Sequence, residues 1–148
     1  MKTVVIFGAG HLGKQLANII DSHLSDRFKI LGFSDDVVDK NVRVFKDYVN
    51  LGPLEEINCK DLIFGIGYSK MLDRQEAFKR ALRLGLTFQS VIHPQAIVEP
   101  TATLLPGVIV LAGAIVDQHV TIGEVTLVDI GCIIGEKTVI GQSNFIAA

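Results

Sequence analysis

The chain has 148 residues, of which 49% are hydrophobic and 20% charged, and its formal net charge is −2. This composition is typical of a globular protein with one domain or two small ones, and the charge gives no reason to expect a nucleic-acid partner. No apolar stretch of about 18 residues is free of breakers, so we expect no membrane span. The two cysteines lie outside any pairing motif, and we expect no signal peptide before Lys2. Both features favour a cytoplasmic protein.

The first expected strand leads into a glycine-rich loop. Residues 3–7 are an uninterrupted β-branched and aromatic run, followed by Gly8-Ala9-Gly10-His11-Leu12-Gly13 and then by apolar residues at helical spacing over 12–24. Glycines at these three positions permit a tight turn and a close backbone approach, and the amides at the helix start attract a phosphate. A nucleotide site is the favoured interpretation. A plain structural turn and an NAD site remain as alternatives.

Two further strands are expected to end beside this loop. Residues 28–33 form one, ending at Asp35 and Asp36, near where a dinucleotide-binding unit places its ribose-binding carboxylate. After an irregular polar stretch over 37–58, residues 60–66 form the other, ending in the turn around Gly67. Alternation of strands with helices predicts a small, mostly parallel α/β sheet. Its ligand should lie beyond the carboxyl ends of these strands.

A helix and one more strand complete this first part of the chain. We expect the helix over 71–84, with one side formed by Met71, Arg74, Phe78, Ala81 and Leu82, and with Gly85 ending it. Residues 87–92 then form a last strand that leads into a different kind of sequence.

From residue 92 onward, a branched aliphatic recurs at every sixth position. A period of six fits neither a helix nor a simple alternation, and it predicts the stacked coils of a parallel β-helix. Because three six-residue repeats make one coil, residues 18 apart should stack on one another. A β-sandwich is the less favoured alternative. Prolines and glycines recur at fixed phases after the aliphatic, as corners require. The ten aliphatics are Ile92, Val98, Leu104, Val110, Val116, Ile122, Val128, Ile134, Ile140 and Ile146.

The composition also changes where this repeat begins. Residues 92–148 contain five acids and only Lys137 as a lysine or arginine, whereas the preceding residues are slightly basic. We therefore expect two domains, 1–91 and 92–148. The second stops partway into a rung at Ala148, which makes it look incomplete.

Four motifs in this order resemble the bacterial sugar O-/N-acyltransferases. That group includes sialic-acid O-acetyltransferases and enzymes that acetylate UDP-linked 4-amino sugars. The resemblance covers essentially the whole chain and implies a Rossmann-like domain followed by a left-handed β-helix. The motifs are Gly8-Ala9-Gly10…Gly13, Gly32-Phe33-Ser34-Asp35-Asp36, Ile66-Gly67…Arg74 (with Gly67-Tyr68-Ser69-Lys70-Met71 between) and Ile92-His93-Pro94.

The resemblance also implies an activity: transfer of an acetyl group from acetyl-CoA to an amine or hydroxyl of a nucleotide-linked sugar in surface-polysaccharide synthesis. It implies a homotrimer that binds acetyl-CoA between neighbouring β-helices. Family members usually read Gly-Gly-His-Gly in the loop, so the histidine of Gly10-His11-Leu12-Gly13 is displaced by one position. The implied substrate-binding residues are Gly8, Gly10, His11, Leu12, Gly13, Asp35, Asp36 and Gly67.

The catalytic centre departs from the family pattern. Glu136 stands where the best-studied members carry the histidine that acts as general base, and His119 matches a second histidine position one coil earlier. We expect His119 to stack on Lys137 and to occupy a corner. Our catalytic candidates are His119 and Glu136. The alternative is a non-catalytic or truncated relative that only binds a sugar nucleotide, with both residues as solvated corner side chains.

Overall fold

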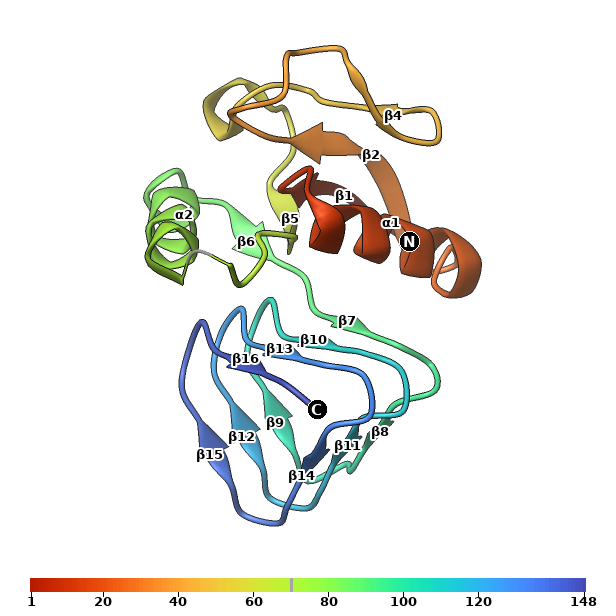
Figure 1. Cartoon of the computed structure of the whole chain (residues 1–148), viewed down its shortest axis with the longest axis vertical. Coiled ribbons are helices and arrows are strands. Elements are labelled where there is room, and N and C mark those ends of the chain that lie inside the picture. Colours follow the sequence, from red (N-terminus) through yellow and green to blue (C-terminus); the bar gives the residue numbers. More distant parts are fainter. Residues whose placement is uncertain (70) are drawn as a thin grey trace. The chain divides into compact units, whose positions relative to one another are not determined.

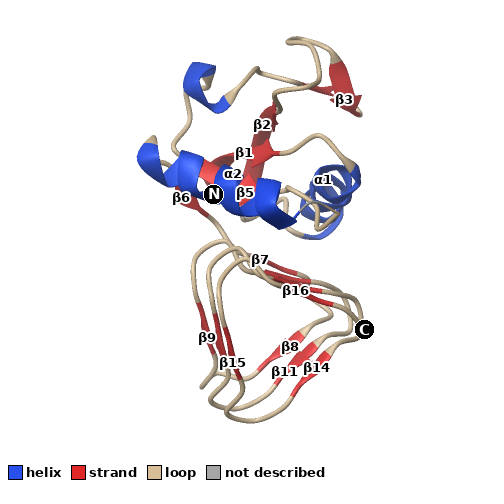
Figure 2. Ribbon diagram, turned by 60° about the vertical axis from the view of Figure 1, so that its left-hand side comes forward, coloured by secondary structure: helices blue, strands red, loops and turns tan. Residues whose placement is uncertain are grey.

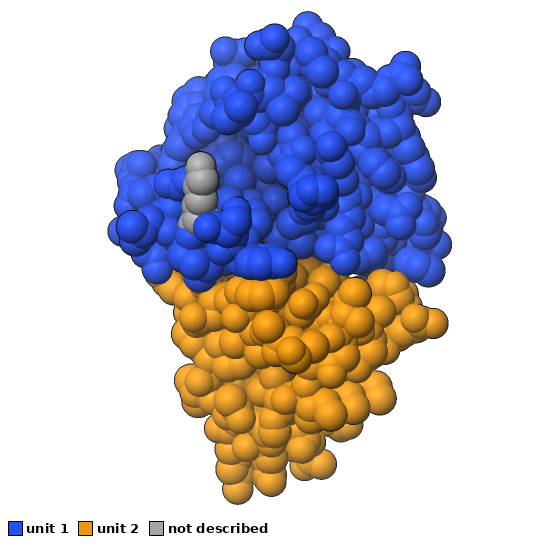
Figure 3. Space-filling view, in the orientation of Figure 1, with its two compact units in different colours: residues 1–88 blue, residues 89–148 orange. Residues whose placement is uncertain are grey.

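The computed structural model describes residues 1–69 and 71–148. Lys70, which belongs to the motif around Gly67, lies outside the described residues. The chain divides into two compact units, Met1–Phe88 and Gln89–Ala148, which are coloured separately in Figure 3. Each is described by itself below as the N-terminal unit and the C-terminal unit.

A parallel four-stranded sheet forms the centre of the N-terminal unit (Figure 1). Its order is β2-β1-β5-β6, and every pairing between neighbours is parallel, as the alternation of strands and helices predicted. The carboxyl ends of β1, β2 and β5 therefore meet at one edge. The strands are β1 (Lys2–Phe7), β2 (Phe28–Ser34), β5 (Asp61–Phe64) and β6 (Thr87–Phe88).

Helices α1 (His11–His23) and α2 (Met71–Arg83) cover opposite faces of this sheet (Figure 2). The side chain of Ile6 lies against Gly13 of α1. The ring of Phe64 packs edge-on against Phe78 of α2, with 6.4 Å between centroids. Phe64 pairs with Phe7, and consecutive residues of a strand point to opposite faces, so Ile6 and Phe64 face different helices.

The polar stretch after β2 is more ordered than the sequence predicted. It contains a short antiparallel hairpin of β3 (Arg43–Phe45) and β4 (Tyr48–Val49), followed by the single-turn helix η1 (Leu54–Glu56). The hairpin is attached to α1 through Asp21, which accepts hydrogen bonds from Tyr48 and Lys46. Side-chain contacts with distant residues, and not local apolar periodicity, order this segment.

A parallel β-helix of two-residue strands forms the C-terminal unit, and Figure 2 shows its triangular cross-section. The three faces are the sheets β16-β13-β10-β7, β14-β11-β8 and β15-β12-β9. Partners are 18 residues apart, as predicted: Ile115, for example, pairs with both Ile97 and Ile133. The strands are β7 (Val91–Ile92), β8 (Ile97–Val98), β9 (Thr103–Leu104), β10 (Ile109–Val110), β11 (Ile115–Val116), β12 (Thr121–Ile122), β13 (Leu127–Val128), β14 (Ile133–Ile134), β15 (Val139–Ile140) and β16 (Phe145–Ile146).

The ten periodic aliphatics form the core of this β-helix. Five of them are among its buried residues and the other five pack against that cluster. Cys132 is also buried there, and burial raises the pKa of its thiol. The third residue after the aliphatic takes a positive φ at seven successive corners from Gly107 onward, where a left-handed backbone turns the chain. Those corners are Gly107, Gly113, His119, Val125, Gly131, Lys137 and Ser143.

Three predictions about elements were wrong in detail. Residues 87–92 do not form one strand: β6 pairs with β5 and β7 pairs with β10, so the segment serves two different sheets. The strand expected over 60–66 ends at Phe64. On α2, Leu82 and Met71 are exposed while Arg74, Phe78 and Ala81 are buried, because only the last three face the sheet.

Within the described part of the chain, no helix is both long and apolar enough to cross a membrane.

Candidate nucleotide-sugar site

The glycines that open and close the loop after β1 are required by close backbone packing. A Cβ on Gly13 would lie 1.9 Å from the carbonyl oxygen of Gly8, and Gly8 itself has φ +110°. Gly65, at the end of β5, is also closely packed, since its Cβ would be 3.0 Å from the Cα of Gly13. These three glycines bring the β1 and β5 strand ends together with the start of α1. Side chains larger than hydrogen would separate them.

Gly10 and Gly67 are different, because the space that their side chains would fill is empty. A Cβ on either residue would meet no atom within 4 Å. Both residues line a cavity of about 420 Å³ at the carboxyl edge of the sheet. The missing side chains leave the backbone open to the cavity, as close approach of a ligand requires. The cavity is lined by Gly8, Ala9, Gly10, His11, Leu12, Asp35, Gly65, Ile66, Gly67, Tyr68 and Ser69.

The start of α1 makes this cavity suitable for an anion. Gly10 is the N-cap and gives no side-chain cap, and the first turn contains no acidic residue. The first backbone hydrogen bond of the helix runs from Lys14 to Gly10, so the preceding amides have no acceptor inside the helix. The positive end of the helix dipole therefore faces the loop without a neutralising carboxylate of its own. Such an arrangement favours a phosphate group.

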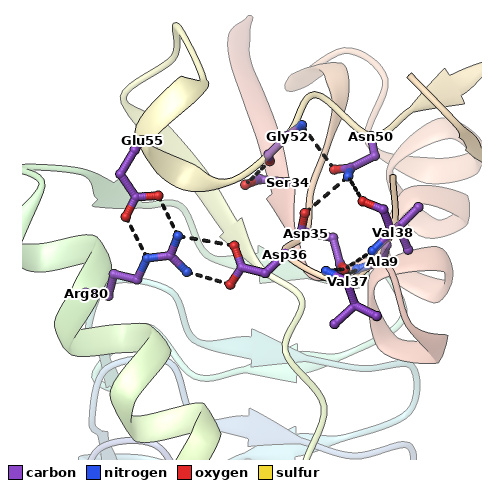
Figure 4. A network of polar contacts seen from close by, with 10 residues as sticks. All are labelled: Ala9, Ser34, Asp35, Asp36, Val37, Val38, Asn50, Gly52, Glu55 and Arg80. Carbon is purple, nitrogen blue, oxygen red and sulfur yellow. Dashed lines mark hydrogen bonds and ion pairs between the residues drawn. The ribbon is translucent and has the colours of Figure 1, made fainter. Parts of the chain in front are cut away.

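Asp35, at the end of β2, holds the loop in place. One carboxylate oxygen accepts the amide of Ala9 at 2.9 Å, and the other accepts those of Val37 and Val38 at 2.8 and 3.0 Å (Figure 4). Burial alone would raise the pKa of Asp35, but the amides of Val38, Ala9 and Val37 outweigh it and lower that pKa. The carboxylate therefore stays ionised and ties the β2 end to the glycine loop.

Asp36 has a different environment, in a second cavity of about 490 Å³ that shares Asp35 and Ile66 with the first. Arg80 of α2 donates to both Asp36 and Glu55, with its Nη1 2.6 Å from Asp36 and its Nε 2.8 Å from Glu55 (Figure 4). Hydrogen bonds from Arg80 lower the pKa of Glu55 to about 2, and both carboxylates raise the pKa of Arg80. Arg80 thus fixes the position of the Asp36 carboxylate at the edge of the site.

Arg74 supports the opposite wall of the first cavity. It is fully buried, its Nε donates to the carbonyl of Ile66 at 3.1 Å, and its guanidinium lies 4.9 Å from the centre of the Phe64 ring. Burial lowers the pKa of Arg74 to about 10, so it remains a cation near neutral pH. Arg74 fixes the turn after β5, which carries Gly67 into the cavity.

The two catalytic candidates lie on the C-terminal unit, at corners of the β-helix. His119 is exposed with φ 57°, and its backbone amide donates to Thr101 Oγ1 at 3.0 Å. Lys137 stacks below it, as predicted, since both residues take the left-handed corner and the Lys137 amide donates to Gln118. Glu136 is exposed and its carboxylate lies 3.7 Å from the Lys137 ammonium.

The structure thus gathers most of the predicted binding residues but not all of them. Six line the first cavity: Gly8, Gly10, His11, Leu12, Asp35 and Gly67. Asp36 lines the second cavity, and Gly13 is packed against Gly8 and lines neither. Tyr68 and Ser69 also line the first cavity; their turn was expected at the ligand edge of the sheet, but they were not among the named binding residues. Nothing in the sequence pattern pointed to Arg80, which meets Asp36 from 44 residues away.

Comparison with known proteins identifies relatives of this fold. No family model matches the sequence. The curated proteins yield no match either. Among solved structures, a variant of perosamine N-acetyltransferase from Caulobacter crescentus, in complex with CoA and GDP-perosamine, superposes with a TM-score of 0.83 at 22% identity. That match covers 98% of this chain and 68% of the other.

Two further solved structures are similar. The acetyltransferase domain of PglB from Neisseria gonorrhoeae FA1090, in complex with acetyl coenzyme A, has a TM-score of 0.81 at 23% identity, covering 97% of this chain and 69% of that one. PerB from Caulobacter crescentus, in complex with CoA and GDP-perosamine, has a TM-score of 0.67 at 24% identity, covering 96% and 64%. At these identities the likeness establishes a shared fold that extends over nearly the whole of this chain.

Proposed function

We propose that this chain transfers an acetyl group from acetyl-CoA to an amine or hydroxyl of a nucleotide-linked sugar. The observation that carries the proposal is the cavity at the start of α1. Its backbone is open at Gly10 and Gly67, and the first amides of α1 have no acceptor within the helix. The shared fold adds support, because solved structures of that fold hold CoA together with GDP-perosamine.

In this proposal the N-terminal unit binds the nucleotide. The diphosphate lies at the amides that begin α1, where the helix dipole favours it and the first turn of the helix carries no acidic side chain. Asp36, held in place by Arg80, accepts hydrogen bonds from the hydroxyl or N–H groups of the nucleoside. Together with the parallel sheet, these features support the finer description of this unit as Rossmann-like.

The C-terminal unit supplies the base. The backbone of His119 takes the left-handed conformation at a corner whose equivalents in other turns of the β-helix include Gly107, Gly113 and Gly131. An L-residue in this conformation is strained by about 1–2 kcal/mol. Val125, Lys137 and Ser143 take the same conformation, so the assignment of His119 rests on its imidazole and not on the strain. Histidine is the side chain most often used as a general base, so His119 is the preferred candidate over Glu136.

The chemical step follows from these roles. The sugar amine or hydroxyl attacks the thioester carbonyl, a new C–N or C–O bond forms, and the C–S bond breaks to release CoA as the thiolate. His119 accepts the proton that the nucleophile loses and can pass it to the departing sulfur.

We further propose a cytoplasmic homotrimer of left-handed β-helices, with acetyl-CoA bound between neighbouring chains.

Replacing His119 tests the catalytic assignment. His119→Ala should lower kcat for acetyl transfer by about 100-fold or more, the usual contribution of a positioned base, while leaving the Kd for the nucleotide unchanged. The matched control is Lys137→Ala, which changes the stacked corner without removing the imidazole. Equal rates in wild type and His119→Ala would reject His119 as the base, and a comparable loss in Glu136→Gln alone would assign that role to Glu136.

A non-catalytic sugar-nucleotide-binding protein is the second candidate. The observation that favours it is that, among the described residues, no hydrogen-bond partner orients the His119 imidazole, while Glu136 pairs with Lys137. Nucleotide binding without acetyl transfer, in the presence of acetyl-CoA and several sugar nucleotides, would support this candidate against the first.

A further inference from the structure

A buried asparagine lies behind the turn that carries Asp35 and Asp36. Asn50 is fully buried, and its Nδ2 donates to the carbonyls of Asp35 at 3.1 Å and Val38 at 2.6 Å (Figure 4). Its Oδ1 accepts the amide of Gly52 at 3.3 Å. All three contacts are consistent with one orientation of the amide group, with both donor hydrogens used on the turn.

The contacts continue from Asn50 to the glycine loop without a break. Asn50 holds the two ends of the turn over 35–38, and the Asp35 carboxylate accepts the amides of Val37 and Val38 inside that turn. Its other oxygen accepts the amide of Ala9. The position of Ala9 therefore depends on Asp35, and that of Asp35 depends on Asn50. Asn50 itself lines neither of the two cavities.

The segment that carries Asn50 is itself fixed, as a support must be. The amide of Leu51 donates to Phe33 of β2 at 2.7 Å, and the hydroxyl of Ser34 donates to the Gly52 carbonyl at 2.9 Å. At the hairpin before it, Tyr48 donates to Asp21 of α1 at 2.8 Å. Asn50 thus connects a segment hydrogen-bonded to β2 with the turn over 35–38, in which Val37 is 91% exposed.

We propose that Asn50 is a positioning residue for the nucleotide-sugar site, acting through Asp35 on the backbone of the glycine loop. The inference rests on the proposed function and extends it to a residue outside the cavity. Because Asp35 occupies the Ala9 amide, the amides that follow it remain directed at the ligand, and the loop requires no reorganisation when the phosphate binds. Asp35 then acts mainly by holding the loop, which leaves Asp36 as the more available carboxylate.

Two variants and one control test this chain of contacts. Asn50→Ala removes the donors. Asp35→Asn keeps the shape but replaces one acceptor oxygen by an NH2 group, so the side chain can no longer accept from Ala9 on one side and from Val37 and Val38 on the other. The control, Tyr48→Phe, loses one hydrogen bond of the same segment but leaves the turn intact. Each is titrated with GDP and UDP, and hydrogen exchange of the Ala9 amide is followed in the unliganded protein.

We expect both variants to weaken nucleotide binding about tenfold, to raise KM for the sugar nucleotide with kcat at saturation unchanged, and to speed exchange of Ala9. The double variant should be no weaker than either single one, since both act on one contact path. Tyr48→Phe should change none of these. If Asn50→Ala does not fold, Asn50→Ser, which keeps a polar side chain but has one donor hydrogen instead of two, carries the test.

The outcomes separate this inference from the function on which it rests. If the wild-type chain binds no nucleotide, the proposed function is rejected. Hydrogen exchange of the Ala9 amide then still decides whether Asn50 holds the loop. If the wild-type chain binds nucleotide, and both variants keep its affinity and its rate of Ala9 exchange, the role of Asn50 is overturned. A weakening equal to that of Tyr48→Phe would also overturn it, because the effect would then be general loosening of the segment.

Discussion

The glycine loop of the N-terminal unit and the His119 corner of the C-terminal unit handle unusual backbone geometry in different ways. In the loop, the positive φ belongs to a glycine, Gly8, and the carboxylate of Asp35 satisfies nearby amides. At the corner, His119 and Lys137 take the left-handed conformation with full side chains, and both side chains are exposed. The loop is preorganised for a ligand, whereas the corner is strained and open.

This difference indicates where each region depends on something outside itself. The glycine loop and its supports all lie within residues 1–88, so every nucleotide contact that we propose comes from the N-terminal unit. The corner has no internal partner for its imidazole among the described residues, and a base requires an orienting group or a bound substrate. Binding is therefore the more robust of the two proposed activities.

The largest expected effect is on the loop packing. Gly13→Ala places a Cβ 1.9 Å from the Gly8 carbonyl oxygen, so we expect loss of cooperative unfolding of the N-terminal unit. Gly10→Ala, whose Cβ meets no atom within 4 Å, should keep wild-type stability. Urea unfolding of both variants makes the comparison. Equal stabilities would show that the loop is not close-packed.

The next effect concerns the β-helix core. Ile134→Ala removes a side chain that is 4% exposed and should lower the free energy of unfolding by about 2–5 kcal/mol. The neighbouring Ile133 is 75% exposed, and Ile133→Ala should change stability by less than about 0.5 kcal/mol. A similar loss in both variants would contradict the inward column that the six-residue period predicts.

A smaller effect, of opposite sign, is expected at the corner. Lys137→Gly should raise the free energy of unfolding by about 1 kcal/mol, because glycine takes φ 63° without steric strain. Lys137→Ala, which keeps the Cβ, should not. His119→Gly should likewise stabilise the chain but abolish acetyl transfer. Thermal melts and the transfer assay together would show whether strain is retained for activity, and an unchanged melt in both glycine variants would reject the strain.

The smallest effect is a dependence on pH. The pKa of Glu55 is about 2 in the folded chain against 4.5 for a free glutamate, so its pairing with Arg80 stabilises the fold above pH 4.5 and is lost as the pH falls toward about 2. Glu55 is largely exposed, so the effect should stay below about 1 kcal/mol. Arg80→Met should remove it, as acid titrations of the melting temperature can show. An identical acid transition in the variant would assign the dependence elsewhere.

Much of the fold could be predicted because its signals are local or periodic. The aliphatic column from Ile92 to Ile146 predicted both the core and the 18-residue register, and Gly8–Gly13 between a strand and a helix predicted the loop. The supports of the site could not be predicted in this way. Asn50 meets Val38 across 12 residues and Arg80 meets Asp36 across 44, and neither contact follows from a repeat. Such pairs depend on how distant elements pack.

The measurement that tests the central claim most directly is calorimetric titration of the chain with GDP and with UDP, in wild type and in Gly10→Val, after confirming that the variant melts cooperatively. We predict that wild type binds at least one of the two nucleotides and that Gly10→Val, which fills the open space in the loop, binds it at least about tenfold more weakly. No binding by wild type, or equal affinity in the folded variant, would contradict the assignment of the glycine-loop cavity as a nucleotide-sugar site.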